Sequence, residues 1–364
     1  MIKEIRIKNY KSVNKLKLDL GRVNVFIGAN GCGKSNLLEA IGLGAMAFGG
    51  HGLPNEFLIS RGIRVTEPQF MRSAFEKDTQ NKNVELSFTY NNAIEWGVDL
   101  SHDGAPFSEW DTKPKEKLSN LIIKAIEENK VTPNFDIDLI MREKYSIVKH
   151  VEKFSIFSPE NEKLREFASK STTALGIHGS GLFYLLSVST EEEIAEIKQN
   201  LKLIDWFDDF EMMGNEQTGE KKINIKDRYI ANQEFPFDQR NANEGFLFLL
   251  FYLSLFISKY TPPFFAIDNI DNALNPKLCT ALARRLTKLS QKHDKQVLIT
   301  THNPAVLDGL DLNDEEQRLF IVYRNIEGHT KVQRVNKKPR IEGEESVKLS
   351  EAFLRGYLGG LNKV

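Results

Sequence analysis

The sequence predicts an α/β fold in which helices cover the faces of a parallel sheet. A short apolar run, Val23–Ile27, leads through a glycine-rich loop into a helical pattern over Asn36–Phe48. Two further apolar runs, Phe264–Ile267 and Val297–Thr301, flank Pro276–His293, a helix pattern with one apolar stripe. A strand, a helix and a strand at this spacing form a right-handed parallel crossover. We therefore expect the sheet to be built from segments at both ends of the chain.

Composition limits the classes of protein that remain. The chain has 364 residues, enough for two structural units of roughly 150 residues each. Its net charge of −1 excludes a polycation that holds nucleic acid by bulk charge. The longest apolar run, Phe246–Ile257, is about 12 residues, whereas a bilayer span needs about 20. We expect a cytoplasmic protein without a membrane partner, and its charged, alternating N-terminus is unlike a secretory signal.

The first 111 residues are predicted to form the N-terminal part of the α/β body. Apolar and charged positions alternate in two runs that end near residue 20, which indicates a hairpin of half-buried strands; the apolar positions are Ile2, Ile5, Ile7, Leu16, Leu18 and Leu20. Val84–Tyr90 and Glu95–Leu100 are predicted to be antiparallel strands.

A change in composition predicts an insertion over residues 112–230. Lys113–Lys130 is charged with helical spacing, and Leu164–Phe210 combines charged helices with a glycine-containing turn at Gly176–Gly181. We interpret 112–230 as a mainly helical lobe inserted into the α/β body.

The body is predicted to resume over residues 231–364. It begins with a buried core helix at Phe246–Ile257, followed by the crossover described above. Arg318–Val335 is expected to be a hairpin and Val347–Leu358 the last helix.

The loop after the first apolar strand has the chemistry of a phosphate cradle. Gly28–Ser35 reads GANGCGKS and matches G-x-x-x-x-G-K-[ST] between a strand and a helix. Glycines let successive N–H groups point at phosphate oxygens, and the helix N-terminus adds its positive dipole end. Lys34 can reach the β and γ phosphates, and the Ser35 hydroxyl can bind Mg²⁺. The candidate nucleotide contacts are Asn30, Gly31, Cys32, Gly33, Lys34, Ser35 and Asn36.

Segments distributed along the chain resemble one family. They are IRIKNYKSV at the start, NVFIGANGCGKSNLLEAI, FFAIDNIDNALNP, VLITTHNP, and LSEAFLRGYLGG near the end. Together they resemble ABC-type ATPases of the RecF and structural-maintenance-of-chromosomes (SMC) kind, in particular the compact bacterial AAA15/AAA21 group related to OLD-family ATPases. The resemblance implies a P-loop NTPase with an ABC-type ATPase head, N-terminal antiparallel strands and an inserted lobe. It implies ATP and Mg²⁺ as cofactors, and residues 112–230 carry little of it.

The resemblance also implies roles for individual residues. Asp268, at the end of a strand, would hold Mg²⁺ beside Ser35. His302 resembles the switch histidine that contacts the γ-phosphate. Asn243 and Gly245 stand in the signature-like segment before the core helix, which in this family acts on the nucleotide of the opposite subunit. Arg61, Gln69 and Arg72 are candidates for the loop that senses the γ-phosphate.

One position departs from the family. The residue after Asp268 is usually a glutamate that polarises the attacking water, and here it is Asn269. An amide can orient a water but is a poor proton acceptor. Asp271, two residues on, either substitutes as the base or belongs only to the dimer-crossing segment. We predict an ATPase that is slow if Asn269 is not compensated.

The family and the residues together leave three hypotheses open. The first is a homodimeric, ATP-driven switch in antiviral defence or genome maintenance that gates a separately encoded nuclease or toxin. The second is a RecF-like ATPase that binds DNA directly in repair. The third is a nucleotide-dependent scaffold that does not hydrolyse ATP. Nucleic acid contact would fall on two basic clusters: Lys3, Arg6, Lys8, Lys11, Lys15 and Lys17, and Arg334, Lys337, Lys338 and Arg340.

Overall fold

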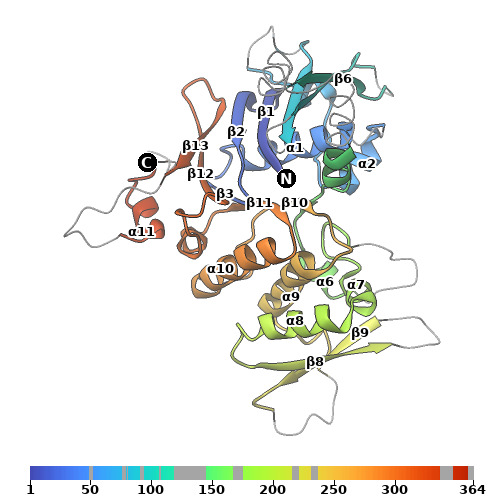
Figure 1. The fold of residues 1–364 in the computed structure, drawn as a ribbon, viewed down its shortest axis with the longest axis vertical. Helices are drawn as coiled ribbons and strands as arrows, with labels where there is room; N and C mark the ends of the chain where they lie inside the picture. Colours follow the sequence, from blue (N-terminus) through green and yellow to red (C-terminus); the bar gives the residue numbers. More distant parts are fainter. Residues whose placement is uncertain are drawn as a thin grey trace, which may run out of the picture.

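The computed structural model describes most of the chain, shown in Figure 1. The described residues are 1–48, 52–75, 79, 81–90, 94–105, 108–118, 145–166, 175–214, 221–230, 237–336 and 347–359. Most of the segment predicted as a helix at Lys113–Lys130 lies outside them, as do Lys337, Lys338 and Arg340. Within these ranges, no helix is both long and apolar enough to cross a membrane.

An antiparallel sheet forms one side of the molecule. The predicted hairpin is confirmed: β1 pairs with β2 antiparallel, and Ile7 faces Leu16. The sheet continues through β4, β5 and β6 in the order β2-β1-β4-β5-β6. Its strands are β1 (Ile2–Tyr10), β2 (Val13–Asp19), β4 (Val84–Tyr90), β5 (Ile94–Ser101) and β6 (Asp111–Leu118).

The last of these strands corrects a prediction. Residues 113–118 were expected to be helical, but they belong to β6, an edge strand paired antiparallel with β5. Pro114 cannot sit inside a helix without removing a hydrogen bond, whereas edge strands accept proline and lysine. Lys115 also forms an ion pair with Asp99 on the neighbouring strand. Pairing with β5 therefore determines the conformation of a segment whose charge pattern alone indicates a helix.

The second sheet is the parallel one that the sequence predicts. Its order is β13-β12-β3-β11-β10-β7, with only β13 antiparallel to its neighbour. The crossover from β10 through α10 to β11 is confirmed. The strands are β3 (Val23–Ile27), β7 (Ile156–Phe157), β10 (Phe264–Ile267), β11 (Gln296–Thr301), β12 (Gln317–Arg324) and β13 (Thr330–Val335).

Two hydrophobic cores cover the two faces of the parallel sheet. On one face, α1 (Lys34–Phe48) lies between the parallel and the antiparallel sheets, and Phe26 of β3 points into this core. On the other face lie α9 (Glu244–Ile257) and α10 (Pro276–Lys292), and Val25 of β3 points into that second core. Every residue of α9 from Phe246 to Ile257 is buried, which confirms the predicted core helix.

Shorter elements complete the fold. The inserted segment contains α6, α7 and α8, but Phe207–Gly214 is a strand, so the helix expected through Phe210 ends earlier. The division of the chain at residues 112 and 230 stays a prediction. The remaining elements are α2 (Asn55–Ser60), α3 (Pro68–Met71), α6 (Asn161–Leu164), α7 (Leu182–Val188), α8 (Glu191–Leu201), β8 (Phe207–Gly214), β9 (Lys221–Asp227), the 3₁₀ helix η2 (Pro304–Gly309) and α11 (Leu349–Leu354).

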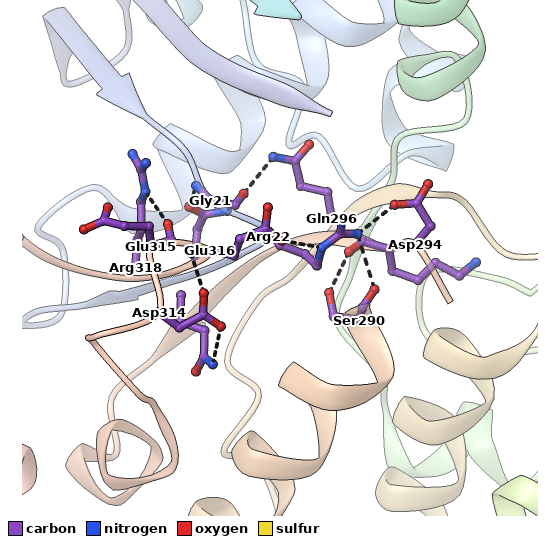
Figure 2. Close-up of polar contacts among 12 residues, drawn as sticks. Gly21, Arg22, Ser290, Asp294, Gln296, Asp314, Glu315, Glu316 and Arg318 are labelled. Carbon is purple, nitrogen blue, oxygen red and sulfur yellow. Dashed lines mark hydrogen bonds and ion pairs between the residues drawn. The ribbon is translucent and has the colours of Figure 1, made fainter. Parts of the chain in front are cut away.

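A polar network ties together the amino ends of the parallel strands (Figure 2). Arg22, just before β3, pairs with Glu316 at 2.7 Å and with Asp294 at 2.8 Å. The Gln296 amide donates to the Gly21 carbonyl at 2.8 Å and so joins β11 to the same end. These contacts join residues about 270 or more positions apart in the chain. They fix the strands at one end, and the phosphate loop leaves from the other.

Candidate nucleotide site

The phosphate loop lies against the β12–β13 hairpin. The Thr330 hydroxyl donates to the Cys32 carbonyl at 2.9 Å, and the Arg324 Nε donates to the Gly31 carbonyl at 2.8 Å. Gly33 has φ +104°, and a Cβ there would stand 2.0 Å from the Thr330 hydroxyl oxygen. Only glycine fits this position, because both the backbone angle and the space exclude a side chain. A hairpin some 290 residues away therefore holds the loop in its cradle shape.

Lys34 is a buried cation whose nearest partners are neutral. Its Nζ donates to the carbonyls of Gly28 at 2.8 Å and Ala29 at 3.1 Å, and lies 3.5 Å from His302 Nδ1. The side chain is 5% exposed, and this burial lowers the pKa of the ammonium. Because a buried charge is costly without a counter-charge, the site favours an anion beside Lys34.

The two predicted metal-binding residues meet. The Ser35 hydroxyl donates to Asp268 Oδ2 at 2.8 Å, although 233 positions separate them. The other carboxylate oxygen of Asp268 accepts from the Thr300 hydroxyl. Both oxygens of Asp268 are thereby oriented, one toward the phosphate-loop helix and one toward β11. Thr300 is not among the residues predicted from the sequence, although it lies in the segment VLITTHNP.

The three candidate catalytic residues, Asn269, Asp271 and His302, also share this end of the sheet. Asn269 has φ +56°, and its N–H donates to the Thr300 hydroxyl at 2.9 Å. Asp271 Oδ1 accepts from the Thr301 hydroxyl at 2.7 Å and from the His302 N–H at 3.2 Å. Asp271 therefore anchors the backbone that presents His302. Burial and the Lys34 charge lower the pKa of His302, which favours its neutral imidazole.

The signature-like segment and the predicted dimer-crossing segment form one surface. The Asn243 side chain caps α9 by accepting from the Phe246 N–H at 2.8 Å. A Cβ on Gly245 would stand 3.3 Å from the Ala273 carbonyl oxygen. Asn243 and Ala273 are both exposed, and Ala273 has φ +60°. The two segments are thus presented to solvent together.

The candidates for the γ-phosphate-sensing loop have other contacts. Gln69 donates to Glu67, and Arg72 donates to the His102 carbonyl. Arg61 donates to the Ser155 hydroxyl at 3.2 Å, just before β7. The sequence prediction missed β7 itself, a two-residue strand that is too short to give a pattern.

Strand β7 places a different loop beside the site. The Asp268 N–H donates to the Phe157 carbonyl at 2.9 Å, so the chain after Phe157 leaves the sheet next to Asp268. Residues 158–160 therefore follow directly on the residue that contacts the Asp268 backbone.

The residues fit a nucleotide with Mg²⁺. Ser35 and Asp268 supply hard oxygen ligands 2.8 Å apart, and Mg²⁺ usually takes one or two protein ligands together with phosphate oxygens and water. Among the described residues, no group of three or more His, Cys, Asp or Glu could hold a metal by itself.

The family model described as "AAA domain, putative AbiEii toxin, Type IV TA system" matches residues 23–308 of this chain. The match runs from β3 into η2 and so includes the phosphate loop, the Asn243–Gly245 segment, Asp268 and His302.

Similar solved structures show the fold. A crystal structure of an SmcHead bound to the C-winged helix domain of ScpA aligns with TM-score 0.58 and 17% identity, covering 92% of this chain and 98% of that one. An Smc head domain bound to the C-terminal domain of ScpA derived from Pyrococcus furiosus aligns with TM-score 0.55 and 16% identity, covering 92% of this chain and 96% of that one. The SMC head domain from Thermotoga maritima aligns with TM-score 0.50 and 16% identity, covering 92% of this chain and 99% of that one.

Similarity to curated proteins is local. The DNA replication and repair proteins RecF of Bacillus thuringiensis (strain Al Hakam) and Bacillus cereus (strain B4264) are each 53% identical over 47 residues. These residues are 13% of this chain and span 12% of the length of each relative.

Proposed function

Because the chain belongs to the AAA-domain family described with a putative AbiEii toxin and type IV TA systems, we propose that it is an ATP-driven dimerisation switch. The chain is an ATPase of the SMC- and RecF-like AAA type. In our proposal two copies dimerise when ATP is bound, and the dimer controls the activity of a separately encoded effector such as a nuclease or toxin. The setting would be antiviral defence or genome maintenance.

The observation that carries the proposal is the division of the site within one chain. Lys34, Ser35, Asp268 and His302 converge at the carboxyl end of the parallel sheet. Gly245 lies instead against the Ala273–Leu274 segment, and Asn243, two residues earlier, is exposed to solvent. A second copy could bring its Asn243–Gly245 segment to the phosphates held by the first. The helix N-terminus capped by Asn243 would then face the γ-phosphate, where N–H groups and the helix dipole favour negative charge.

The chemistry of this chain's residues supports slow turnover. Mg²⁺ bound to ATP would neutralise charge on the transferring phosphoryl group. Lys34 would hold the β and γ oxygens, and Asp268 with Ser35 would hold the ion. A neutral His302 can donate a hydrogen bond to the γ-phosphate. Asn269 can orient a water but cannot take its proton, so the closed state would persist.

Two measurements test the proposal, sedimentation of the wild type and phosphate release by the wild type and by Lys34→Ala. Sedimentation with and without a non-hydrolysable ATP analogue should show a monomer that becomes a dimer, and phosphate release should be slow but dependent on Lys34. A chain that binds the analogue and stays monomeric at micromolar concentration would contradict the switch.

A RecF-like, DNA-binding ATPase is the second candidate, and the local identity with RecF favours it. The described basic residues of the N-terminal hairpin weigh against it, since several are neutralised by carboxylates; the ion pairs are Arg6–Glu95, Lys8–Glu85, Lys17–Glu4 and Lys11–Glu39. Co-purification separates the candidates: nucleic acid supports RecF-like action and a protein supports effector gating. A scaffold that binds ATP without hydrolysis would release no phosphate at all.

A further inference from the structure

One arginine donates hydrogen bonds to the backbone just before the Asn243–Gly245 segment. Arg165 follows α6, and its Nη1 donates to the carbonyls of Gln239 at 2.9 Å and Arg240 at 2.6 Å. Its Nη2 donates to the Ala242 carbonyl at 2.8 Å, and its Nε donates to Asn161 Oδ1 at 2.9 Å. All three guanidinium nitrogens are therefore used, and three carbonyls of one short segment converge on them.

The segment bound by Arg165 is a closed turn, residues 238–242, that leads directly into α9. Asp238 is 2% exposed, and its side chain accepts from the Arg240 N–H at 3.0 Å. The Asp238 carbonyl accepts from the N–H groups of Asn241 and Ala242. The turn thus sends its N–H groups to Asp238 and its carbonyls to Arg165. Since Asn243 is the next residue, Arg165 holds the turn that directly precedes the N-cap of α9.

The other end of the same connection reaches the chain's own metal site. Arg165 is joined through α6 and residues 158–160 to β7, and β7 lies beside β10. The Phe157 carbonyl accepts from the Asp268 N–H. His178 reinforces the intervening loop, because its Nδ1 lies 3.0 Å from the Ser158 carbonyl and 3.1 Å from Glu160 Oε1. The backbone from Phe157 to Arg165, with hydrogen bonds at each end, therefore links Asp268 to the turn before Asn243.

We propose that Arg165 is a positioning residue that holds the Asn243–Gly245 segment in the geometry needed to act on the nucleotide of a second copy. The inference rests on the proposed function, because it needs that segment to work across a dimer. A guanidinium suits this role because its planar fork can donate to several carbonyls at once, whereas a lysine ammonium offers one point of charge. Arg165 would touch neither nucleotide nor metal, and it would act only through the segment that it holds.

The variants Arg165→Met and Arg165→Lys test the positioning role of Arg165, and Lys163→Met is the matched control. Lys163 is a cation of α6 whose ion pair with Glu166 is exposed, so its loss should change little. Arg165→Met should bind nucleotide within about twofold of wild type, yet lose at least about tenfold in ATP-dependent dimerisation, because the charge-assisted bonds that orient the segment are gone. Arg165→Lys should fall between the two. Unchanged dimerisation in both Arg165 variants would overturn the inference.

Mixing two inactive variants separates this role from an effect on the chain's own site. A Lys34→Ala chain cannot hold nucleotide but keeps its Asn243–Gly245 segment. In a heterodimer with Arg165→Met, one composite site combines the intact phosphate loop of the Arg165→Met chain with the intact segment of the Lys34→Ala chain. Phosphate release should then recover to about a quarter of wild type, since half of the dimers carry one complete site. No recovery would mean that Arg165 acts in its own site.

A second mixture distinguishes failure of the inference from failure of the proposed function. Lys34→Ala mixed with Asn243→Arg should recover to the same extent if the segment acts across the dimer. Recovery with Asn243→Arg but not with Arg165→Met would refute only the role of Arg165. Recovery with neither, from a wild type that hydrolyses ATP, would refute the trans-acting segment and the inference together. If Arg165→Met does not unfold cooperatively, the same mixture is made with Arg165→Lys.

Discussion

Replacing Asn269 by glutamate should convert a slow ATPase into a faster one. The position follows Asp268, the predicted metal ligand, and its backbone is fixed by the N–H bond to the Thr300 hydroxyl. The change puts a proton acceptor where the amide can only orient water. The Asn269→Gln variant is the matched control, because glutamine has the length of glutamate without its basicity.

The backbone at Asn269 sets the size of the gain. A positioned general base contributes typically ~10²–10⁴-fold. The residue has φ +56°, where asparagine is well tolerated but other L-residues cost roughly 1–2 kcal/mol. If the loop relieves that strain by moving, the catalytic geometry is populated about 5–30-fold less. The expected net increase over wild type is therefore between about threefold and about 10³-fold.

Steady-state phosphate release is the assay, at saturating ATP and with nucleotide affinity measured separately. Glutamine should be no faster than wild type, because it carries the strain without the base. The ratio of glutamate to glutamine cancels the strain and should approach the full contribution of a base. A ratio within about twofold of one, with nucleotide binding intact in both variants, would refute the view that this position faces the attacking water.

Four other perturbations have defined outcomes. Asp271→Asn keeps an oxygen that can accept both hydrogen bonds of the carboxylate, so phosphate release should change little if Asp271 is an anchor and fall by ~10²-fold or more if it is the base; Asp271→Ala should slow release in either case. Lys34→Ala should abolish nucleotide binding in calorimetry, and unchanged affinity would contradict the phosphate loop. Asn243→Arg or Gly245→Glu should leave that binding intact but prevent analogue-induced dimerisation in sedimentation, and dimers like those of wild type would remove the trans assignment. Burial lowers the pKa of His150 to about 4, so between pH 6.5 and 4 the unfolded chain binds a proton at this ring and the folded chain does not. As the pH is lowered through this range, the free energy of unfolding should fall by at most ~1.4 kcal/mol per pH unit. Urea midpoints of His150→Gln should depend less on pH than those of wild type, and equal slopes would exclude His150 as the cause.

Local chemistry was enough for the sequence to predict the phosphate loop and the strand and helix on either side of it. The cradle uses consecutive N–H groups and the helix that starts at Lys34, so its residues are contiguous in the chain. The same holds for the crossover β10–α10–β11 and for the buried helix α9, whose apolar patterns reflect burial directly. These elements could be predicted because the residue pattern that identifies each of them lies within one short stretch of the sequence.

Only the tertiary structure decided how the site is held together. The Ser35–Asp268 contact, the Thr330 brace on Cys32 and the grip of Arg165 on the turn before Asn243 join residues 74 to 298 positions apart. Strands β6 and β7 likewise form by pairing with a neighbouring strand, against or without a local pattern. A hydrogen bond between distant residues depends on where the whole chain brings them, and neither residue type nor spacing encodes that position.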